Sequence, residues 1–254
     1  MFAWWRQRRA APAIPQDLWQ SVLTTYPFLA QRPSDEREQL RTLAARFLQD
    51  KEFHGAQGLT ITDEIALSIA AQAVLPVLHL GLGWYDDFVG IVVHPGEVVA
   101  RRTQVDEAGV VHAYDEVLAG EAMDQGPVML SWHDVREAGS RFEDGYNVVI
   151  HEFVHKLDMR DGQADGCPPL GSRAARGAWL EVLTRTYEAF REQVIVAERF
   201  GGEPTWLDPY GAQAIDEFFA VACEGYFVQR ERFAREFPEL GPLFDSFFKP
   251  AARP

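Results

Sequence analysis

The segment that most constrains the fold is residues 147–158, where an apolar run contains two histidines four residues apart. On an α-helix such positions lie on one face, so His151 and His155 can reach a single ion. Neutral imidazole nitrogens are good ligands for Zn²⁺. The apolar residues around the histidines predict a buried helix, and Asp144 is the expected N-terminal cap.

Glu152 adds a possible catalytic function to this helix. It follows His151 in the pattern His-Glu-x-x-His, where a carboxylate can accept a proton from the attacking water, as in zinc peptidases. The pattern fixes only three positions, so it also occurs by chance. The alternative is a helix with two surface histidines and a solvated glutamate, and a third ligand in the right place decides between the two.

Two regions of the chain offer a third ligand. Asp161 and Asp165 follow the motif, but Asp158 stands where metzincins have the glycine that turns the chain sharply back. An apolar segment nearer the C-terminus carries Glu217 and Glu224, which are seven residues apart and therefore share a helix face. Geometry alone allows either glutamate as the ligand, with the other as a hydrogen-bond partner of a histidine. Asp158 shares the histidine face and is also a candidate partner.

The stretches HEFVHKLD (151–158) and DPYGAQAIDEFFAVACEGYF (208–227) resemble the Mlc titration factor A family of bacterial zinc metallopeptidases. The apolar segment at 65–80, GPVMLSW and FPELGPLFDSFF are also similar, so the resemblance extends over most of the chain. It implies a zincin-like fold similar to the catalytic domain of anthrax lethal factor. The expected fold class is therefore α+β and predominantly helical, with a small mixed β-sheet beside the active-site helix.

The resemblance also implies roles for individual residues. His151, His155 and Glu217 correspond to the zinc ligands of the family, Glu152 to its catalytic base and Tyr210 to a tyrosine that lines the site. One Zn²⁺ per chain, a peptide or protein substrate and aminopeptidase-like action follow from it. The family is also described as binding the glucose-responsive repressor Mlc. A zinc peptidase that binds such a repressor is expected; the alternative is a non-catalytic repressor-binding protein with a structural zinc.

Composition restricts the partners and the compartment. The chain of 254 residues has a formal net charge of −14 at pH 7, which argues against direct binding to nucleic acid. Residues 65–80 are mostly apolar but shorter than the roughly 20 residues of a membrane span, so they predict a buried helix and no membrane contact. Two cysteines are too few for a disulfide framework, and the N-terminus lacks the apolar core of a signal peptide. A cytoplasmic protein is expected.

We expect one zincin-like domain at 31–254, preceded by a flexible or loosely packed segment at 1–30. A long helix is expected at 173–200, and strands at 59–61, 88–93, 97–100 and 128–132. In the resembling peptidases such a strand edges the active-site cleft, so the resemblance implies this place for the strand at 128–132, where an extended peptide can add to it through backbone hydrogen bonds.

Overall fold

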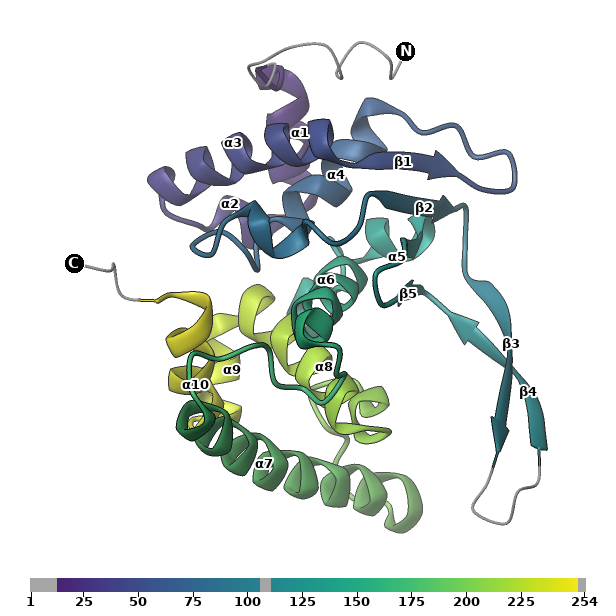
Figure 1. The fold of residues 1–254 in the computed structure, drawn as a ribbon, viewed down its shortest axis with the longest axis vertical. Helices are drawn as coiled ribbons and strands as arrows, with labels where there is room; N and C mark the ends of the chain where they lie inside the picture. Colours follow the sequence, from purple (N-terminus) through teal and green to yellow (C-terminus); the bar gives the residue numbers. More distant parts are fainter. Residues whose placement is uncertain (1–12, 106–110, 251–254) are drawn as a thin grey trace.

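Most of the protein is helical (Figure 1). The computed structural model describes residues 13–105 and 111–250. The α-helices are α1 (Gln16–Thr25), α2 (Pro27–Ala30), α3 (Ser34–Asp50), α4 (Asp63–Ala73), α5 (Trp132–Glu137), α6 (Val148–Asp158), α7 (Arg173–Phe200), α8 (Ile215–Val228), α9 (Arg230–Glu236) and α10 (Leu240–Phe248). Short 3-10 helices lie at Leu82–Tyr85, Phe142–Asp144, Met159–Asp161 and Pro209–Ala212. The strands are β1 (Glu52–Gly55), β2 (Gly90–His94), β3 (Val98–Val105), β4 (Val111–Leu118), β5 (Gly120–Ala122) and β6 (Val128–Ser131).

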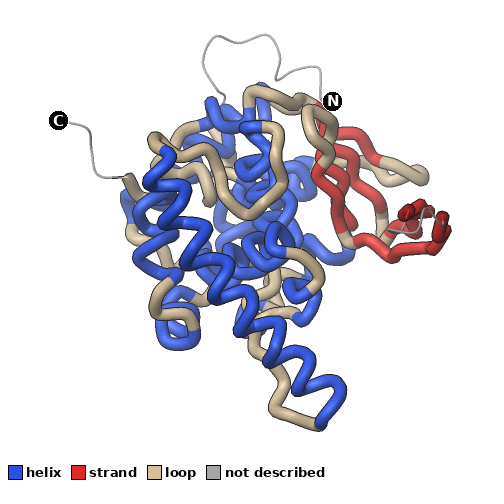
Figure 2. The backbone as a smooth tube through the Cα atoms, turned by 60° about the horizontal axis from the view of Figure 1, so that its bottom comes forward, coloured by secondary structure: helices blue, strands red, loops and turns tan. Residues whose placement is uncertain are grey.

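A small mixed sheet lies at one side of the helical body, with strand order β1-β2-β6-β5 (Figure 2). β1, β2 and β6 run parallel, so that Phe53 pairs with Ile91 and Ile91 with Val128. β5 is antiparallel to β6, with Gly120 opposite Leu130, and forms one edge of the sheet. β3 and β4 form a separate antiparallel hairpin that extends away from the body (Figure 1). The predicted α+β fold, helical with a small mixed sheet, is confirmed.

One predicted strand is wrong. Residues 59–61 lie in an irregular connection, and the strand in this part of the chain is the earlier β1. After β1 the chain reverses through a tight turn, in which Gly58 has a φ of +83° and the N–H of Leu59 donates to the carbonyl of Ala56 at 2.9 Å. The turn brings the carbonyl of Leu59 back over Gly55, so this segment packs on the end of β1 instead of extending the sheet.

The N-terminal segment is more tightly packed than we expected. Residues 1–12 lie outside the described residues, whereas 13–30 contain α1 and α2. Trp19 and Tyr26 are buried in the main core, and the hydroxyl of Tyr26 donates to the carbonyl of Val135 at 3.2 Å. Large apolar side chains on one face of these helices need a partner surface to bury them. The folded unit therefore includes residues 13–30.

Two helices with almost no exposed surface flank α6. In α4 the side chain of Thr62 accepts the N–H of Ile65 at 3.2 Å, and residues 65–73 are all buried. In α8 residues 218–228 are all buried. Both helices pack against α6, which therefore runs through the middle of the protein. Within residues 13–105 and 111–250, no helix combines the length and the apolar character needed to cross a membrane.

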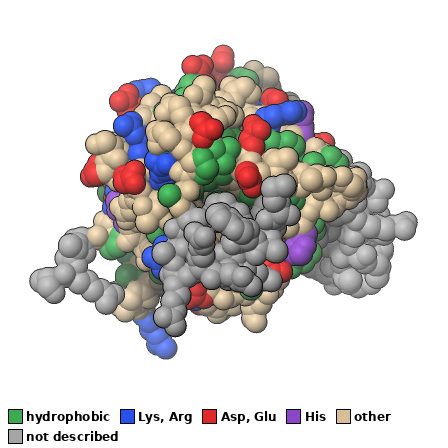
Figure 3. Space-filling view, turned by 90° about the horizontal axis from the view of Figure 1, so that it is seen from above, with side chains coloured by type: hydrophobic (Ala, Val, Ile, Leu, Met, Phe, Trp, Pro, Cys, Tyr) green, Lys and Arg blue, Asp and Glu red, His purple; other side chains and the backbone are tan. Residues whose placement is uncertain are grey.

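Surface charge is mixed on the face shown in Figure 3, where Asp and Glu side chains lie among Lys and Arg side chains. The whole sequence contains 38 acidic and 24 basic residues. Binding to a phosphate backbone needs clustered Lys and Arg. The described side chains of this face form no such cluster.

Candidate active site

Helix α6 begins at a cap that differs from the predicted one. The side-chain oxygen of Asn147 accepts the N–H of Ile150 at 2.9 Å, which satisfies one of the free N–H groups at the helix start. Asp144, the predicted cap, instead ends the preceding 3-10 helix. Gly145, with a φ of +77°, then turns the chain before α6 begins. The prediction of Asp144 as the cap is therefore wrong.

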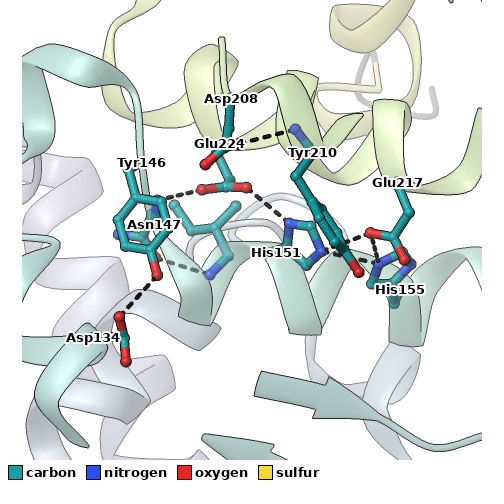
Figure 4. A network of polar contacts seen from close by, with 10 residues as sticks. Asp134, Tyr146, Asn147, His151, His155, Asp208, Tyr210, Glu217 and Glu224 are labelled. Atoms are coloured by element: carbon teal, nitrogen blue, oxygen red, sulfur yellow. Dashed lines mark hydrogen bonds and ion pairs between the residues drawn. The ribbon is translucent and has the colours of Figure 1, made fainter. Parts of the chain in front are cut away.

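The side chains of His151, His155 and Glu217 converge from α6 and α8 (Figure 4). Nε2 of His151 lies 3.0 Å from Oε2 of Glu217 and 3.2 Å from Nε2 of His155. Nε2 of His155 lies 3.4 Å from the same Glu217 oxygen. Two imidazoles and one carboxylate with their ligand atoms this close can hold a metal ion. We call these three residues the metal cluster.

Hydrogen bonds between the histidines and the carboxylates shift the pKa values of His151 and Glu217 in opposite directions. Burial acts to lower the pKa of His151, but hydrogen bonds to the carboxylates of Glu217 and Glu224 outweigh it and raise this pKa well above its usual value. Burial acts to raise the pKa of Glu217, but hydrogen bonds with His151 and His155 lower it. Because a metal ion needs neutral imidazole, metal binding at this cluster competes with protonation.

Glu224 lies on the outer side of His151. Its Oε1 is 2.8 Å from Nδ1 of His151, whereas Glu217 contacts Nε2 of the same ring. Its Oε2 accepts a hydrogen bond from the backbone N–H of Asn147. The spacing of the two glutamates left both open as ligands. The structure brings Glu217 into the metal cluster and gives Glu224 the position of a hydrogen-bond partner that orients the imidazole.

Glu152 is buried between the metal cluster and the edge of the sheet. It is 5% exposed, and this burial is the main cause that raises its pKa to about 7, against the opposing effect of the two histidines. Gly120 of β5 lies so close that a Cβ at this position would be 2.6 Å from both Cγ and Oε1 of Glu152. A carboxyl group with a pKa near 7 is well suited to act as a general base at neutral pH.

The strand that edges this site is β5, and the prediction that the strand at 128–132 would do so is wrong. β6 lies inside the sheet, paired with β2 on one side and β5 on the other. β5 has only three residues, Gly120–Ala122. Its sequence Gly-Glu-Ala lacks the β-branched and aromatic residues typical of strands, which explains why the sequence did not predict it.

Tyr210 lies in the 3-10 helix that precedes α8. Its backbone N–H donates to Oδ1 of Asp208 at 2.9 Å, which fixes the start of that helix. Its ring centroid is 6.0 Å from that of His151, and Figure 4 shows the side chain reaching toward the metal cluster. The phenol is therefore placed to contact a molecule bound there.

Comparison with known proteins agrees with this geometry. The model of the family described as glucose-regulated metallo-peptidase M90 matches residues 2–249. The chain belongs to this family. Its relatives include Mlc titration factor A of Edwardsiella ictaluri, which is 36% identical over 96% of this chain and 92% of that protein. Mlc titration factor A of Serratia proteamaculans is 38% identical, over 92% of this chain and 88% of the relative. An uncharacterised protein of Synechocystis is 33% identical, over 96% of this chain and 88% of that protein.

A cavity of about 310 Å³ opens beside the metal cluster of this M90 family member. Residues of β5, α5, α6, α8 and the segment before α8 contribute to its lining, which includes Gly120, Asp134, Tyr146, His151, Glu152, Asp208, Tyr210 and Glu224. A second cavity of about 220 Å³ shares Arg141, Tyr146 and Asp208 with the first. Pockets of this size and mixed lining typically bind small molecules or parts of larger ones.

The aspartates that follow the motif lie outside the metal cluster. Asp158 is buried, which raises its pKa to about 7, and its Oδ2 accepts the N–H of Gly166 at 2.9 Å. Asp165 forms an ion pair with Arg176, and Asp161 accepts a hydrogen bond within its own loop. Asp158 thus anchors the loop after α6, and the loop carboxylates are engaged away from the histidines.

Two residues of the site were missed by the sequence analysis. Asn147 directly precedes the apolar run, and this position of an Asn is a recognised signal for a helix start. Gly120 carries no such signal, because its importance comes from contact with a residue that is distant in the sequence.

Proposed function

We propose that the protein is a zinc-dependent peptidase in which His151, His155 and Glu217 bind one Zn²⁺. Tetrahedral zinc with bonds of about 2.0–2.1 Å to N and O separates its ligand atoms by roughly 3.3–3.4 Å. The three separations in the metal cluster are 3.0, 3.2 and 3.4 Å. This agreement is the observation that carries the proposal, because little movement of α6 against α8 is needed to admit the ion.

The residues around the metal cluster supply the remaining chemistry. When bound, Zn²⁺ polarises the substrate carbonyl and lowers the pKa of water. Glu152 accepts the proton of the attacking water and passes it to the leaving amine, a role that suits its pKa of about 7. Tyr210 donates a hydrogen bond to the oxyanion that develops on the carbonyl oxygen. Glu224 holds the ring of His151 throughout.

The substrate we propose is an extended peptide that adds to β5. This strand forms the edge of the sheet, and its first residue, Gly120, contacts Glu152. An edge strand offers backbone hydrogen bonds to a peptide, while neighbouring pockets select its side chains. β5 takes the place that we had expected for the strand at 128–132.

Aminopeptidase action needs a group that attracts the free amine of the substrate, and the cavity offers one. Asp134 and Asp208 line it together with Glu152. Asp134 is 7% exposed; its Oδ1 accepts the hydroxyl of Tyr146 at 3.3 Å, and its Oδ2 has no hydrogen-bond partner among the described residues. Carboxylates in a cleft favour a cationic group. Amides with a free amino group should therefore be hydrolysed faster than their N-acetylated counterparts.

Repressor binding is a second proposed function, and the observation that favours it is the name of the relatives, Mlc titration factor A. We propose that this chain also binds a repressor protein of that kind, in the cytoplasm, where its two buried free cysteines would stay reduced. The alternative is a non-catalytic repressor-binding protein with a structural zinc. Binding of purified repressor to zinc-loaded and zinc-free protein, with and without hydrolysis of peptides, distinguishes the two.

Removal of the metal tests the catalytic proposal. Protein stripped with a chelator should lose hydrolysis of a panel of amino-acid and peptide amides. One equivalent of Zn²⁺ should restore it. Hydrolysis that persists in metal-free protein would contradict the proposal.

A further inference from the structure

A series of buried polar side chains runs behind the metal cluster, from α4 to the outer side of His151. Gln72, Asn147 and Glu224 are 0%, 0% and 3% exposed. Polar groups this deeply buried need hydrogen-bond partners. Their hydrogen bonds connect α4, α6 and α8, and Figure 4 shows the part that joins Asn147, Glu224 and His151.

Two side-chain amides in this series have a fixed orientation. Nε2 of Gln72 donates to the carbonyl of Ser68 at 3.0 Å, and because a carbonyl only accepts, Oε1 of Gln72 is left to face Asn147. Nδ2 of Asn147 donates to this oxygen at 2.7 Å. Oδ1 of Asn147 is then available to accept the N–H of Ile150 and cap α6. The first turn of α6 is thereby fixed against α4.

The backbone N–H of Asn147 determines how Glu224 faces His151. It donates to Oε2 of Glu224, which leaves Oε1 2.8 Å from Nδ1 of His151. An ionised carboxylate only accepts hydrogen bonds, so Nδ1 carries the proton. In the neutral ring that metal binding needs, the lone pair is then on Nε2 and points at the metal cluster. The hydrogen bond at one ring nitrogen thus sets the function of the other.

We propose that Asn147 and Gln72 are positioning residues of the metal centre, which hold Glu224 so that it keeps the proton of His151 on Nδ1. The inference rests on the proposed zinc site, because it makes Nε2 of His151 a ligand. The side chains of both residues act through Glu224; the contact of Asn147 with the metal cluster is a backbone hydrogen bond, in which the N–H of His151 donates to its carbonyl at 3.0 Å. A residue that only capped α6 would stabilise the fold without affecting zinc affinity, and this difference can be measured.

Glu224→Gln is the sharpest test, because it keeps the shape of the side chain. Its amide oxygen has to face the N–H of Asn147, which places its NH₂ group against Nδ1 of His151. Nδ1 must then accept, so the proton moves to Nε2 and blocks the ligand position. We expect the affinity for Zn²⁺, measured by competition with a chromophoric chelator, to fall about 10- to 100-fold. Unchanged affinity would overturn the inference.

Two further variants test the residues themselves. Asn147→Ser keeps a capping oxygen but removes the donor to Gln72. Gln72→Met removes the acceptor that orients Asn147. Both should weaken zinc binding, whereas Thr62→Ala, which removes the cap at the other end of α4, should lower the thermal midpoint and spare zinc affinity.

The comparison of these variants separates positioning from structural support. The inference is refuted if Asn147→Ser, Gln72→Met and Thr62→Ala all lower the thermal midpoint and none of them changes the affinity for zinc. Zinc affinity is measured without a peptide. A wild type that binds zinc but hydrolyses no peptide would therefore contradict the proposed function and leave the affinity result to decide this inference.

Discussion

Replacement of Gly120 by alanine tests how closely the edge strand fixes Glu152. A Cβ at Gly120 would lie 2.6 Å from Cγ and Oε1 of Glu152 and 2.8 Å from its Cδ. Ordinary van der Waals contact begins at 3.4 Å, so the new methyl group and the carboxylate have to separate by about 0.8 Å. The size of the effect depends on which of the two groups moves.

The strand has little freedom to move. The N–H of Ser131 donates to the carbonyl of Ala119 at 2.7 Å, directly beside Gly120. Beyond β5, Nζ of Lys156 donates to the carbonyl of Met123 at 2.8 Å and ties this part of the chain to α6. The carboxylate is therefore displaced instead. A displacement of about 1 Å in a catalytic group can cost about 10²-fold in rate, which equals about 2.7 kcal/mol of activation free energy.

Gly120→Ala should accordingly lower kcat about 100-fold and leave one zinc per chain, because the three atoms nearest to the new Cβ all belong to Glu152 and none to the metal cluster. Steady-state hydrolysis of a peptide amide and metal analysis of the same sample measure both quantities. Gly96→Ala is the matched control, since a Cβ there meets no atom within 4 Å. Wild-type kcat in Gly120→Ala, or loss of zinc in parallel with loss of rate, would refute this reasoning.

Four further predictions follow from the site and the core. Glu217→Ala should abolish stoichiometric zinc in metal analysis, and full metal content would transfer the ligand role to another residue. Tyr210→Phe should lower kcat about 10²-fold and spare zinc, as expected for loss of an oxyanion donor; an unchanged rate would remove Tyr210 from the mechanism. Zinc affinity should rise with pH and zinc binding should release protons, because the raised pKa of His151 makes the ion compete with a proton; pH-independent affinity would contradict this. Burial lowers the pKa of Lys51 in the folded protein to about 8, below its ordinary value of 10.5, so the unfolded chain binds more protons between these values. The contribution of Lys51 to the free energy of unfolding should therefore rise with pH from about 8 to 10.5, and in urea titrations Lys51→Met should differ from the wild type by the loss of this contribution.

The metal cluster could be predicted from the sequence to the extent that it depends on helical spacing. The spacing of four positions from His151 to His155 fixes a common helix face whatever the tertiary structure is. The spacing of seven positions from Glu217 to Glu224 does the same on α8. Helical spacing could not decide which of the two glutamates is the ligand, because that depends on how α8 lies against α6. Packing places one carboxylate at Nε2 and the other at Nδ1 of the same ring.

The parts that the sequence did not predict come from contacts between distant segments. Gln72 is 75 residues from Asn147, and Gly120 faces Glu152 across the edge of the sheet. β5 is a strand because β6 pairs with it, although its three residues have little intrinsic preference for one. The packing of residues 13–30 could likewise not be predicted, because the surface that buries Trp19 and Tyr26 is formed by later parts of the chain.

The most direct test of the central claim compares zinc-loaded wild type with Glu152→Gln on the same panel of amino-acid and peptide amides. The variant keeps the shape of the side chain and all three residues of the metal cluster but has no carboxylate to accept a proton. We predict hydrolysis by the wild type and its loss in the variant, with one zinc retained in each. Equal hydrolysis by both proteins, or none by the zinc-loaded wild type, would contradict a peptidase that uses Glu152 as its base.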